Sequence, residues 1–228
     1  MKFSIILPTF NEKNNIIKLL SLLKNILINY SYEIIVVDDN SSDGTWQFVK
    51  EYSKKNKRVR LLRRTKKKGL SSAIRDGIRK AKNEYVVVMD ADGQHDEKIL
   101  PKIIKEIQNN DLVVASRRKW SKFSTRSKFA KFISKTVLGV RLSDPLSGYF
   151  ALRKTLFNKI DKELKPKGFK FLLEFYVKAK PTRVKEVFFD FKDRKKGKSK
   201  QSIKVMIDFL ISVIHLFVYK LKKRSNLN

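Results

Sequence analysis

Short apolar runs alternate with segments of helical periodicity through the first half of the chain, and this alternation constrains the fold more than any other feature. The strand-like runs are Phe3–Leu7, Glu33–Val37, Val59–Leu62, Tyr85–Met89 and Leu112–Ala115. The helical segments are Glu12–Ile28, Thr45–Lys55, Leu70–Lys82 and Asp96–Gln108. Nearly continuous apolar strands separated by helices indicate a parallel sheet that is buried on both faces. We therefore predict a doubly wound α/β fold.

The second half of the chain is less regular. Tyr149–Leu152 and Arg183–Phe189 are strand-like, and Phe169–Lys178 is helical. Residues 117–140 are basic and have a helical period. Neither an internal repeat nor a domain linker is visible, so we expect these elements to join the same sheet.

Polar loops follow three of the predicted strands. They are Pro8–Glu12, Asp38–Gly44 and Asp90–Gln94. In parallel sheets, ligands bind beyond the carboxyl ends of the strands. Turn and cap preferences alone account for Asp43 and Gly44 before one helix and for Asp96 before another. They do not account for paired acids after two different buried strands, so we predict a binding site at this rim.

The net charge is strongly positive and unevenly distributed. The 228 residues include 53 Lys and Arg against 22 Asp and Glu, a formal net charge of +31. Residues 117–204 hold 27 of the basic and 7 of the acidic residues. This asymmetry suggests a polyanionic partner for the second half, either nucleic acid, a phosphorylated substrate or an anionic membrane. For the lysines alone, a surface that serves only solubility is an equally good explanation.

Composition and motif spacing argue against several classes of protein. The absence of cysteine excludes disulfides and thiolate metal sites, and His95 and His215 lie too far apart in sequence to suggest a zinc enzyme. Three acidic loops would repel nucleic acid, so a nucleic-acid-binding protein is only the rival hypothesis. Gly197 to Ser199 resemble the end of a P-loop, but Lys192 stands where that motif requires glycine.

Asp90 and Asp92 are the sharpest local signal, because two carboxylates follow an apolar strand with one residue between them. Such a pair can hold one hard cation while diphosphate oxygens complete its coordination, as is common for Mg²⁺. Gln94 can add a neutral oxygen. We predict Asp90, Asp92 and Gln94 as ligands of Mg²⁺ or Mn²⁺.

Seven motifs occur along the chain in a specific order. They are PTFNE (8–12), VDDNSSDGT (37–45), KGLSSA (68–73), MDADGQH (89–95), SRR (116–118), DPLSGYF (144–150) and RKKGKSK (194–200). Over about residues 2–201 this set resembles the family 2 glycosyltransferases, and within them the polyprenyl-phosphate sugar transferases. The resemblance implies a GT-A, Rossmann-like fold with a mostly parallel central sheet and a metal-dependent enzyme.

The resemblance also implies the reaction, which is transfer of a sugar from a nucleotide sugar to dolichyl or another polyprenyl phosphate. Mannose from GDP-mannose is the first expectation, and another donor such as UDP-glucose, or another acceptor, is the alternative. A phosphate monoester has a second pKa of about 6 and is already anionic at pH 7, so no general base is expected. We predict a single inverting displacement that gives a β-linked product from an α-linked donor.

Residues of the donor site are carried over from the resemblance. The implied nucleotide-sugar-binding residues are Pro8, Phe10, Glu12, Val37, Asp39, Asp90, Ala91, Asp92, Lys170, Arg194 and Lys200. Of these, Asp90, Asp92, Arg194 and Lys200 are the expected catalytic residues. A solvated helix start explains Lys170 almost as well as a role in phosphate binding.

The acceptor phosphate is expected to meet the basic second half, where guanidinium groups can form charge-assisted, bidentate hydrogen bonds. The candidate ligands are Arg117, Arg118, Arg126 and Ser127, and Arg194 can pair with the phosphate as well. The family often has an arginine one helical turn before the residue aligned with Ser127, but Phe123 stands there in this chain. Either Arg126 substitutes for that arginine or the acceptor site differs.

Residues 202–221 have the pattern of an amphipathic helix. The polar stripe consists of Lys204, Asp208, Ser212, His215 and Tyr219. The apolar face consists of Ile203, Met206, Ile207, Leu210, Ile211, Ile214, Phe217 and Val218. We expect a catalytic domain over 1–201 and a helix with a basic tail over 202–228, which lies in the interface of an anionic membrane. A helix that packs on its own domain is the alternative.

The expected location is the cytoplasmic face of a membrane, with peripheral attachment. Lys2 to Leu7 is too short an apolar run for a signal peptide, and no stretch is long and apolar enough for a conventional transmembrane span. A membrane-embedded partner subunit is a further candidate partner.

Overall fold

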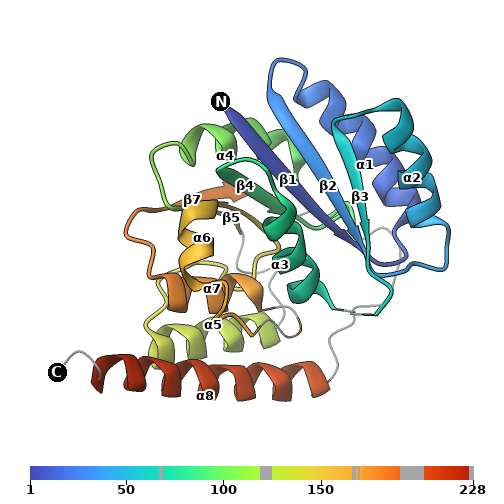
Figure 1. Ribbon diagram of the computed structural model, residues 1–228. Coiled ribbons are helices and arrows are strands. Elements are labelled where there is room, and N and C mark those ends of the chain that lie inside the picture. The colour runs from blue at the N-terminus through green and yellow to red at the C-terminus, as the bar shows by residue number, and fades with distance from the viewer. Residues whose placement is uncertain (67–68, 119–124, 166–167, 169, 191–202, 226–228) are drawn as a thin grey trace.

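A seven-stranded mixed sheet forms the centre of the computed structural model, which describes residues 1–66, 69–118, 125–165, 168, 170–190 and 203–225 (Figure 1). The strands are β1 (Lys2–Thr9), β2 (Ser31–Asp38), β3 (Val59–Arg63), β4 (Tyr85–Met89), β5 (Leu112–Arg117), β6 (Tyr149–Arg153) and β7 (Val184–Phe189). The α-helices are α1 (Lys13–Ile26), α2 (Thr45–Lys55), α3 (Leu70–Lys80), α4 (Leu100–Glu106), α5 (Thr125–Leu138), α6 (Lys154–Ile160), α7 (Phe171–Ala179) and α8 (Ile203–Ser225).

The strand order is β3-β2-β1-β4-β6-β5-β7. β1, β2, β3 and β4 are parallel to their neighbours in this group, and β5 is parallel to β7. β6 alone runs antiparallel, between β4 and β5. The mostly parallel α/β sheet predicted from the sequence is therefore confirmed. One reversed strand, β6, lies between β4 and β5 in the sheet, although it follows β5 along the chain.

Both faces of the sheet are buried, because successive side chains of a strand point to opposite faces. In β1, Ile5 belongs to the core beneath α1, α2 and α4, whereas Ile6 belongs to the core beneath α3 and α5 to α8. Gly77 lets α3 lie directly on β1, since a Cβ at this position would be 2.4 Å from Ile6 Cγ2. Helices on both faces were expected and are confirmed.

Some elements differ from the sequence-based expectation. The basic segment 117–140 begins as the end of β5, and its helix α5 covers Thr125–Leu138. The expected helix at Asp96–Gln108 is a 3₁₀ turn, Glu97–Ile99, followed by the short helix α4. α6 was not predicted. At the lower edge of Figure 1, α8 lies alongside α5 on the outside of the molecule.

Candidate active site

The three polar loops leave the same rim of the sheet, because β1, β2 and β4 are adjacent parallel strands. Thr9 at the end of β1 pairs with Asp38 at the end of β2. β4 pairs with the other edge of β1 and ends at Met89, just before Asp90. The acidic loops therefore meet at one rim, as the sequence predicted.

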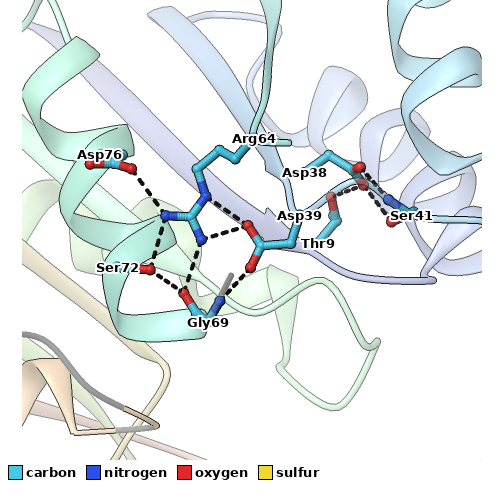
Figure 2. A network of polar contacts seen from close by, with 8 residues as sticks. All are labelled: Thr9, Asp38, Asp39, Ser41, Arg64, Gly69, Ser72 and Asp76. Carbon is cyan, nitrogen blue, oxygen red and sulfur yellow. Dashed lines mark hydrogen bonds and ion pairs between the residues drawn. The ribbon is translucent and has the colours of Figure 1, made fainter. Parts of the chain in front are cut away.

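Asp38 orders the loop after β2 from the inside. Its Oδ2 accepts hydrogen bonds from Thr9 Oγ1 at 2.9 Å and Ser41 Oγ at 2.6 Å, and its Oδ1 accepts one from the Ser41 backbone N–H at 2.9 Å. The side chain is fully buried. Asp38 therefore stabilises the loop, while its neighbour Asp39 turns to the opposite side (Figure 2).

Asp39 faces the start of α3. Its Oδ1 accepts a hydrogen bond from Arg64 Nε at 2.7 Å, and its Oδ2 accepts one from the Gly69 backbone N–H at 2.7 Å (Figure 2). Both Asp39 and Arg64 are buried. The carboxylate predicted to contact the nucleotide is thus oriented by two protein donors at the rim.

The loop after β1 presents both buried and open side chains to the rim. Pro8 and Val37 pair in register across β1 and β2 and are buried. Phe10 is exposed at the rim. Glu12 Oε2 accepts a hydrogen bond from Asn15 Nδ2 at 2.6 Å. All four predicted nucleotide residues of this group therefore lie at or directly beneath the rim.

Asp90 directly follows β4, and its carboxylate packs closely against Gly148. Its Oδ1 is buried and accepts no hydrogen bond from the part of the chain that the structure describes. Its Oδ2 is 3.5 Å from His95 Nε2. A Cβ at Gly148 would lie 1.9 Å from the same Oδ2, so this position accommodates only glycine while Asp90 keeps its place.

His95 lies beside Asp90 and is buried. Its buried ring packs edge-on to Tyr149, with ring centroids 5.2 Å apart, and lies 5.8 Å from the ring of Phe189. Burial raises the pKa of Tyr149 well above its usual value, and the charges of Asp96 and Glu97 raise it further. His95 therefore lies between the Asp90 carboxylate on one side and two aromatic rings on the other, and the Tyr149 hydroxyl stays protonated at neutral pH.

The predicted metal ligands suit a divalent cation of the Mg²⁺ type. Asp92 Oδ1 accepts a hydrogen bond from the Gln94 backbone N–H at 3.1 Å, which ties the two residues together, and Ala91 between the two acids is buried. The buried, undonated oxygen of Asp90 is an acceptor of the kind that a hard cation uses. Among the described residues no cluster of three or more His, Cys, Asp or Glu side chains could hold a metal. A cation here would thus need Gln94 or substrate oxygens as well as the two carboxylates.

Arg117, a predicted acceptor ligand, is held by an acid from the loop before β6. Its Nε and Nη2 donate to Asp144 Oδ2 at 2.7 Å and Asp144 Oδ1 at 3.1 Å. Arg118 is exposed, and Ser127 is partly buried at the start of α5. The structure therefore places Arg117 in a fixed orientation at the end of β5.

Several predicted residues lie outside the described part of the chain. They are Phe123, Arg194 and Lys200, together with the side chain of Arg126 and the boundary between residues 201 and 202. Their predicted roles remain predictions.

Lys170 is buried between α3, α7 and α8, so the alternative of a solvated helix start is wrong. Its backbone N–H donates to Ser71 Oγ at 3.1 Å, and its Nζ donates to Ser212 Oγ at 2.8 Å and to the carbonyl of Asp208. This ammonium therefore links the body of the protein to α8. Its predicted contact with the donor phosphates remains a prediction.

α8 packs on its own domain and also presents an apolar outer face. Phe209, Val213 and Leu216 are buried in the core with α5 and α7. The exposed apolar side chains of α8 are Ile207, Leu210, Ile211, Ile214, Phe217, Val218 and Leu221. None of the helices in the described ranges is long and apolar enough to span a bilayer.

Three residues of the site received no role from the sequence. Arg64 is one of many basic residues, and nothing in its local pattern separates it from Arg63. Asp144 and Gly148 lie within the DPLSGYF motif, which signalled importance without a function. Their roles depend on contacts between distant segments.

Comparisons with known proteins agree with this geometry. The profile of glycosyl transferase family 2 matches residues 4–167. A dolichol-phosphate mannosyltransferase of Pyrococcus furiosus is 41% identical over 231 residues, which cover 96% of this chain and 65% of that protein. A protein of the same name from Saccharomyces cerevisiae is 33% identical over 238 residues, covering 96% of this chain and 88% of that protein. The chain thus spans slightly less than two thirds of the P. furiosus relative.

Solved structures support the fold. The glucosyl-3-phosphoglycerate synthase of Mycobacterium tuberculosis, in complex with Mn²⁺, UDP-glucose and phosphoglyceric acid, superposes with a TM-score of 0.73. The identity is 15%, and the match covers 95% of this chain and 79% of that one. Together with the family profile over most of the sheet and the acidic rim, this similarity leads to one conclusion. The chain belongs to glycosyl transferase family 2, and its fold is of the GT-A type.

Proposed function

We propose that this protein transfers mannose from GDP-mannose to dolichyl phosphate or a related polyprenyl phosphate. The observation that carries this proposal is the match to relatives named dolichol-phosphate mannosyltransferase at 33–41% identity over 96% of the chain. The acidic loops after β1, β2 and β4 and the arginine at the end of β5 lie at the same edge of the sheet, which supports a site for both a donor and an anionic acceptor.

The donor nucleotide would lie over the ends of β1 and β2. Phe10 offers a ring to the base, and Asp39 and Glu12 offer carboxylate oxygens to its donors or to the ribose, above the buried Pro8 and Val37. Lys170, Arg194 and Lys200 are the proposed cations for the donor phosphates. A bound cation neutralises the diphosphate leaving group.

Asp90, Asp92 and Gln94 would hold that cation, Mg²⁺ or Mn²⁺. The support is the buried Asp90 oxygen with no donor among the described residues and the close packing of the Asp90 carboxylate against Gly148. The protein contributes two fixed negative charges and one amide oxygen at this position.

The acceptor would attack from the basic side of the site. Arg117 is the best-ordered candidate for binding its phosphate, since Asp144 fixes the plane of the guanidinium. Arg118, Arg126 and Ser127 are the further candidates. An anionic phosphate oxygen needs positioning rather than deprotonation, and a single displacement at the anomeric carbon inverts it to the β configuration.

α5 and α8 would place this site against an anionic lipid surface. α5 and α8 pack against each other, and each carries exposed apolar side chains: Phe129 and Phe132 on α5, and Ile214, which is 61% exposed, on α8. Lysines of both helices flank these side chains, including Lys128, Lys135, Lys222 and Lys223. Apolar contact with the acyl chains and attraction to the headgroups would act together, with the protein bound peripherally at the cytoplasmic face.

The test is incubation of the purified chain with Mg²⁺, polyprenyl phosphate and a panel of labelled nucleotide sugars that includes GDP-mannose and UDP-glucose. We expect a mannosyl lipid with a β linkage, and loss of turnover in Asp92→Ala. A lipid product from another donor would reassign the sugar, and an α-linked product would contradict the inversion. No lipid-linked product from any donor would refute the proposal.

A further inference from the structure

Arg64 connects the end of β2 to the start of α3. Its backbone N–H donates to the Asp38 carbonyl at 2.8 Å, which extends the pairing of β3 with β2 by one residue. Its side chain is only 5% exposed, so the guanidinium needs protein partners. We infer that Arg64 is a positioning residue of the donor site, which fixes the Asp39 carboxylate for its contact with the nucleoside. This inference rests on the proposed use of a nucleotide-sugar donor.

On one side of the guanidinium, both contacts go to the same oxygen of Asp39. Arg64 Nε is 2.7 Å and Nη2 is 2.5 Å from Asp39 Oδ1 (Figure 2). Asp39 Oδ2 instead accepts the Gly69 N–H at 2.7 Å. The carboxylate plane is thus set by donors from two separate segments.

On its other side, the remaining N–H groups of the guanidinium all find acceptors, either in α3 or at Gly69, the residue before it. Nη1 donates to Ser72 Oγ at 2.9 Å and to Asp76 Oδ2 at 3.0 Å, while Nη2 donates to the Gly69 carbonyl at 3.1 Å. Gly69 has a φ of +127°, which side-chain-bearing residues rarely adopt. The turn that supplies both a donor to Asp39 and an acceptor to Arg64 is therefore specific to glycine.

The hydrogen-bonding capacity of Asp39 shows why this arrangement serves a ligand. A carboxylate has about four acceptor sites, and the described residues use two on Oδ1 and one on Oδ2. The acceptor capacity that remains lies on Oδ2, at a rim whose neighbouring loops carry Phe10 and Glu12. A base N–H or a ribose hydroxyl is the neutral donor that fits such a position. Inorganic phosphate does not fit, because it carries negative charge.

Lysine cannot replace Arg64 here, because an ammonium lacks the planar fork that binds Asp39, Gly69, Ser72 and Asp76 at once. Without that fork, Asp39 is free to turn toward solvent. The expected consequence is weaker nucleotide binding with an unaltered chemical step, since Arg64 contacts none of the metal-site residues Asp90, Asp92 and Gln94 in the described structure.

Asp76 provides a matched control. It contacts the same guanidinium as Asp39 but lies on α3, away from the rim. Asp76→Asn removes a charge from the network without removing a donor to Asp39. Asp76→Asn should therefore lower the thermal stability of the protein without changing its affinity for the nucleotide.

The experiment is isothermal titration of the full chain with GDP and, separately, with UDP, in the presence of Mg²⁺. For the nucleoside diphosphate that the unaltered protein binds, we expect Arg64→Lys to raise Kd about tenfold, the effect of one lost charge-assisted hydrogen bond. Asp76→Asn should change Kd less than about twofold, whereas Asp39→Asn should match Arg64→Lys. The double variant Asp39→Asn, Arg64→Lys should bind the nucleotide no more weakly than either single variant. Both substitutions act through the same contact, the one between Asp39 and the nucleoside.

An unchanged Kd in Arg64→Lys, or an equal increase in Arg64→Lys and Asp76→Asn, would overturn the inference. If Arg64→Lys does not fold, Asp39→Asn decides, and an unchanged Kd in that variant overturns the inference too. Failure of the unaltered protein to bind either nucleotide would instead count against the proposed function. With the active donor, Arg64→Lys should raise KM and leave kcat within about twofold.

Discussion

Asp90 and Gly148 are so closely apposed that the carboxylate occupies space that any other residue at 148 would need for its side chain. The two lie at the end of β4 and just before β6, which are adjacent antiparallel strands. The position of the first acid of the Asp-x-Asp pair is thus determined by a residue 58 positions later in the chain.

Gly148→Ala should displace the Asp90 carboxylate and weaken metal binding. We expect the Kd for Mn²⁺, measured by electron paramagnetic resonance in the presence of GDP, to rise about 10- to 100-fold, as for other residues that orient metal ligands. Gly139→Asn is the control, because Gly139 follows α5 and its nearest neighbour for a Cβ is Lys220 Nζ at 3.7 Å. Equal Kd values for Gly148→Ala and the unaltered protein would disprove the role of this close packing.

Arg117→Met should impair use of the acceptor and spare the donor. Removal of the guanidinium fixed by Asp144 should raise the KM for polyprenyl phosphate about 10- to 100-fold, the range for hydrogen bonds to a charged group. The KM for the nucleotide sugar should stay within about twofold. Arg141→Met, a charge-matched change at an exposed position, should alter neither constant. A selective increase in the donor KM would contradict the assignment.

Ile214→Glu should reduce binding to lipid without unfolding the protein. Ile214 is exposed on the outer face of α8, whereas Phe209, Val213 and Leu216 hold the helix on the body. Cosedimentation with vesicles that contain phosphatidylserine should fall severalfold, while the far-ultraviolet circular dichroism spectrum stays the same. Ile28→Glu is the control, since Ile28 is 72% exposed in the loop after α1. Equal losses in the two variants would rule out a specific surface.

Asp161 should make the fold sensitive to acid. Burial raises the pKa of this carboxyl, but hydrogen bonds from Arg75 and Arg79 outweigh burial and lower it below 3.8. The folded state thus favours the ionised form, and the resulting stabilisation is present above pH 3.8 and is lost as the pH falls below it.

Asp161→Asn should therefore lower the free energy of unfolding at neutral pH by on the order of 1 kcal/mol, and by less in acid. Urea denaturation at neutral pH and at about pH 3 measures the free energy of unfolding of both proteins at each pH. The effect of the substitution depends on pH only if the pKa of the Asp161 carboxyl differs between the folded and the unfolded state. A destabilisation that is the same at both values would show that the ion pairs of α3 with Asp161 do not contribute.

The parallel half of the sheet could be predicted because its signals are local. Each strand from β1 to β4 is a short apolar run next to a helix of clear period, and the polar residues at the strand ends mark the rim. The place of β6 could not be predicted, because its antiparallel pairing with β4 joins Val87 to Ala151 across 64 residues. The run Tyr149–Leu152 has the same pattern whether its neighbours are parallel or antiparallel.

The site could be predicted as a set of motifs but not as a network. Arg63 and Arg64 are adjacent and chemically identical, yet Arg63 is exposed over the ring of Trp46 and Arg64 is buried against Asp39. Which of the two points inward depends on where β3 ends. No property of the residues themselves decides it.

For α8, the helix predicted from the sequence is present, but the sequence analysis did not predict which side meets the body. Ser212 and Tyr219, assigned to a stripe kept in water, contact Lys170 and Glu163 of the body. The predicted apolar face omitted Phe209, Val213 and Leu216, which are the buried residues. A helix with apolar residues over most of its circumference has two candidate inner faces, and only its neighbours select one.

The reversed strand β6 also has a consequence for the order of events at the ribosome. β5 touches β6 and β7 but not β4, so no earlier strand of the chain can pair with it. A nascent chain that ends before Tyr149 can assemble β1 to β4 but must carry the apolar residues of β5 unpaired, a state prone to aggregation. Once five further residues, Tyr149–Arg153, have emerged from the ribosome, they supply a partner for β4 and β5 at once. Ribosome-bound chains stalled before and after this segment should accordingly differ sharply in protease resistance.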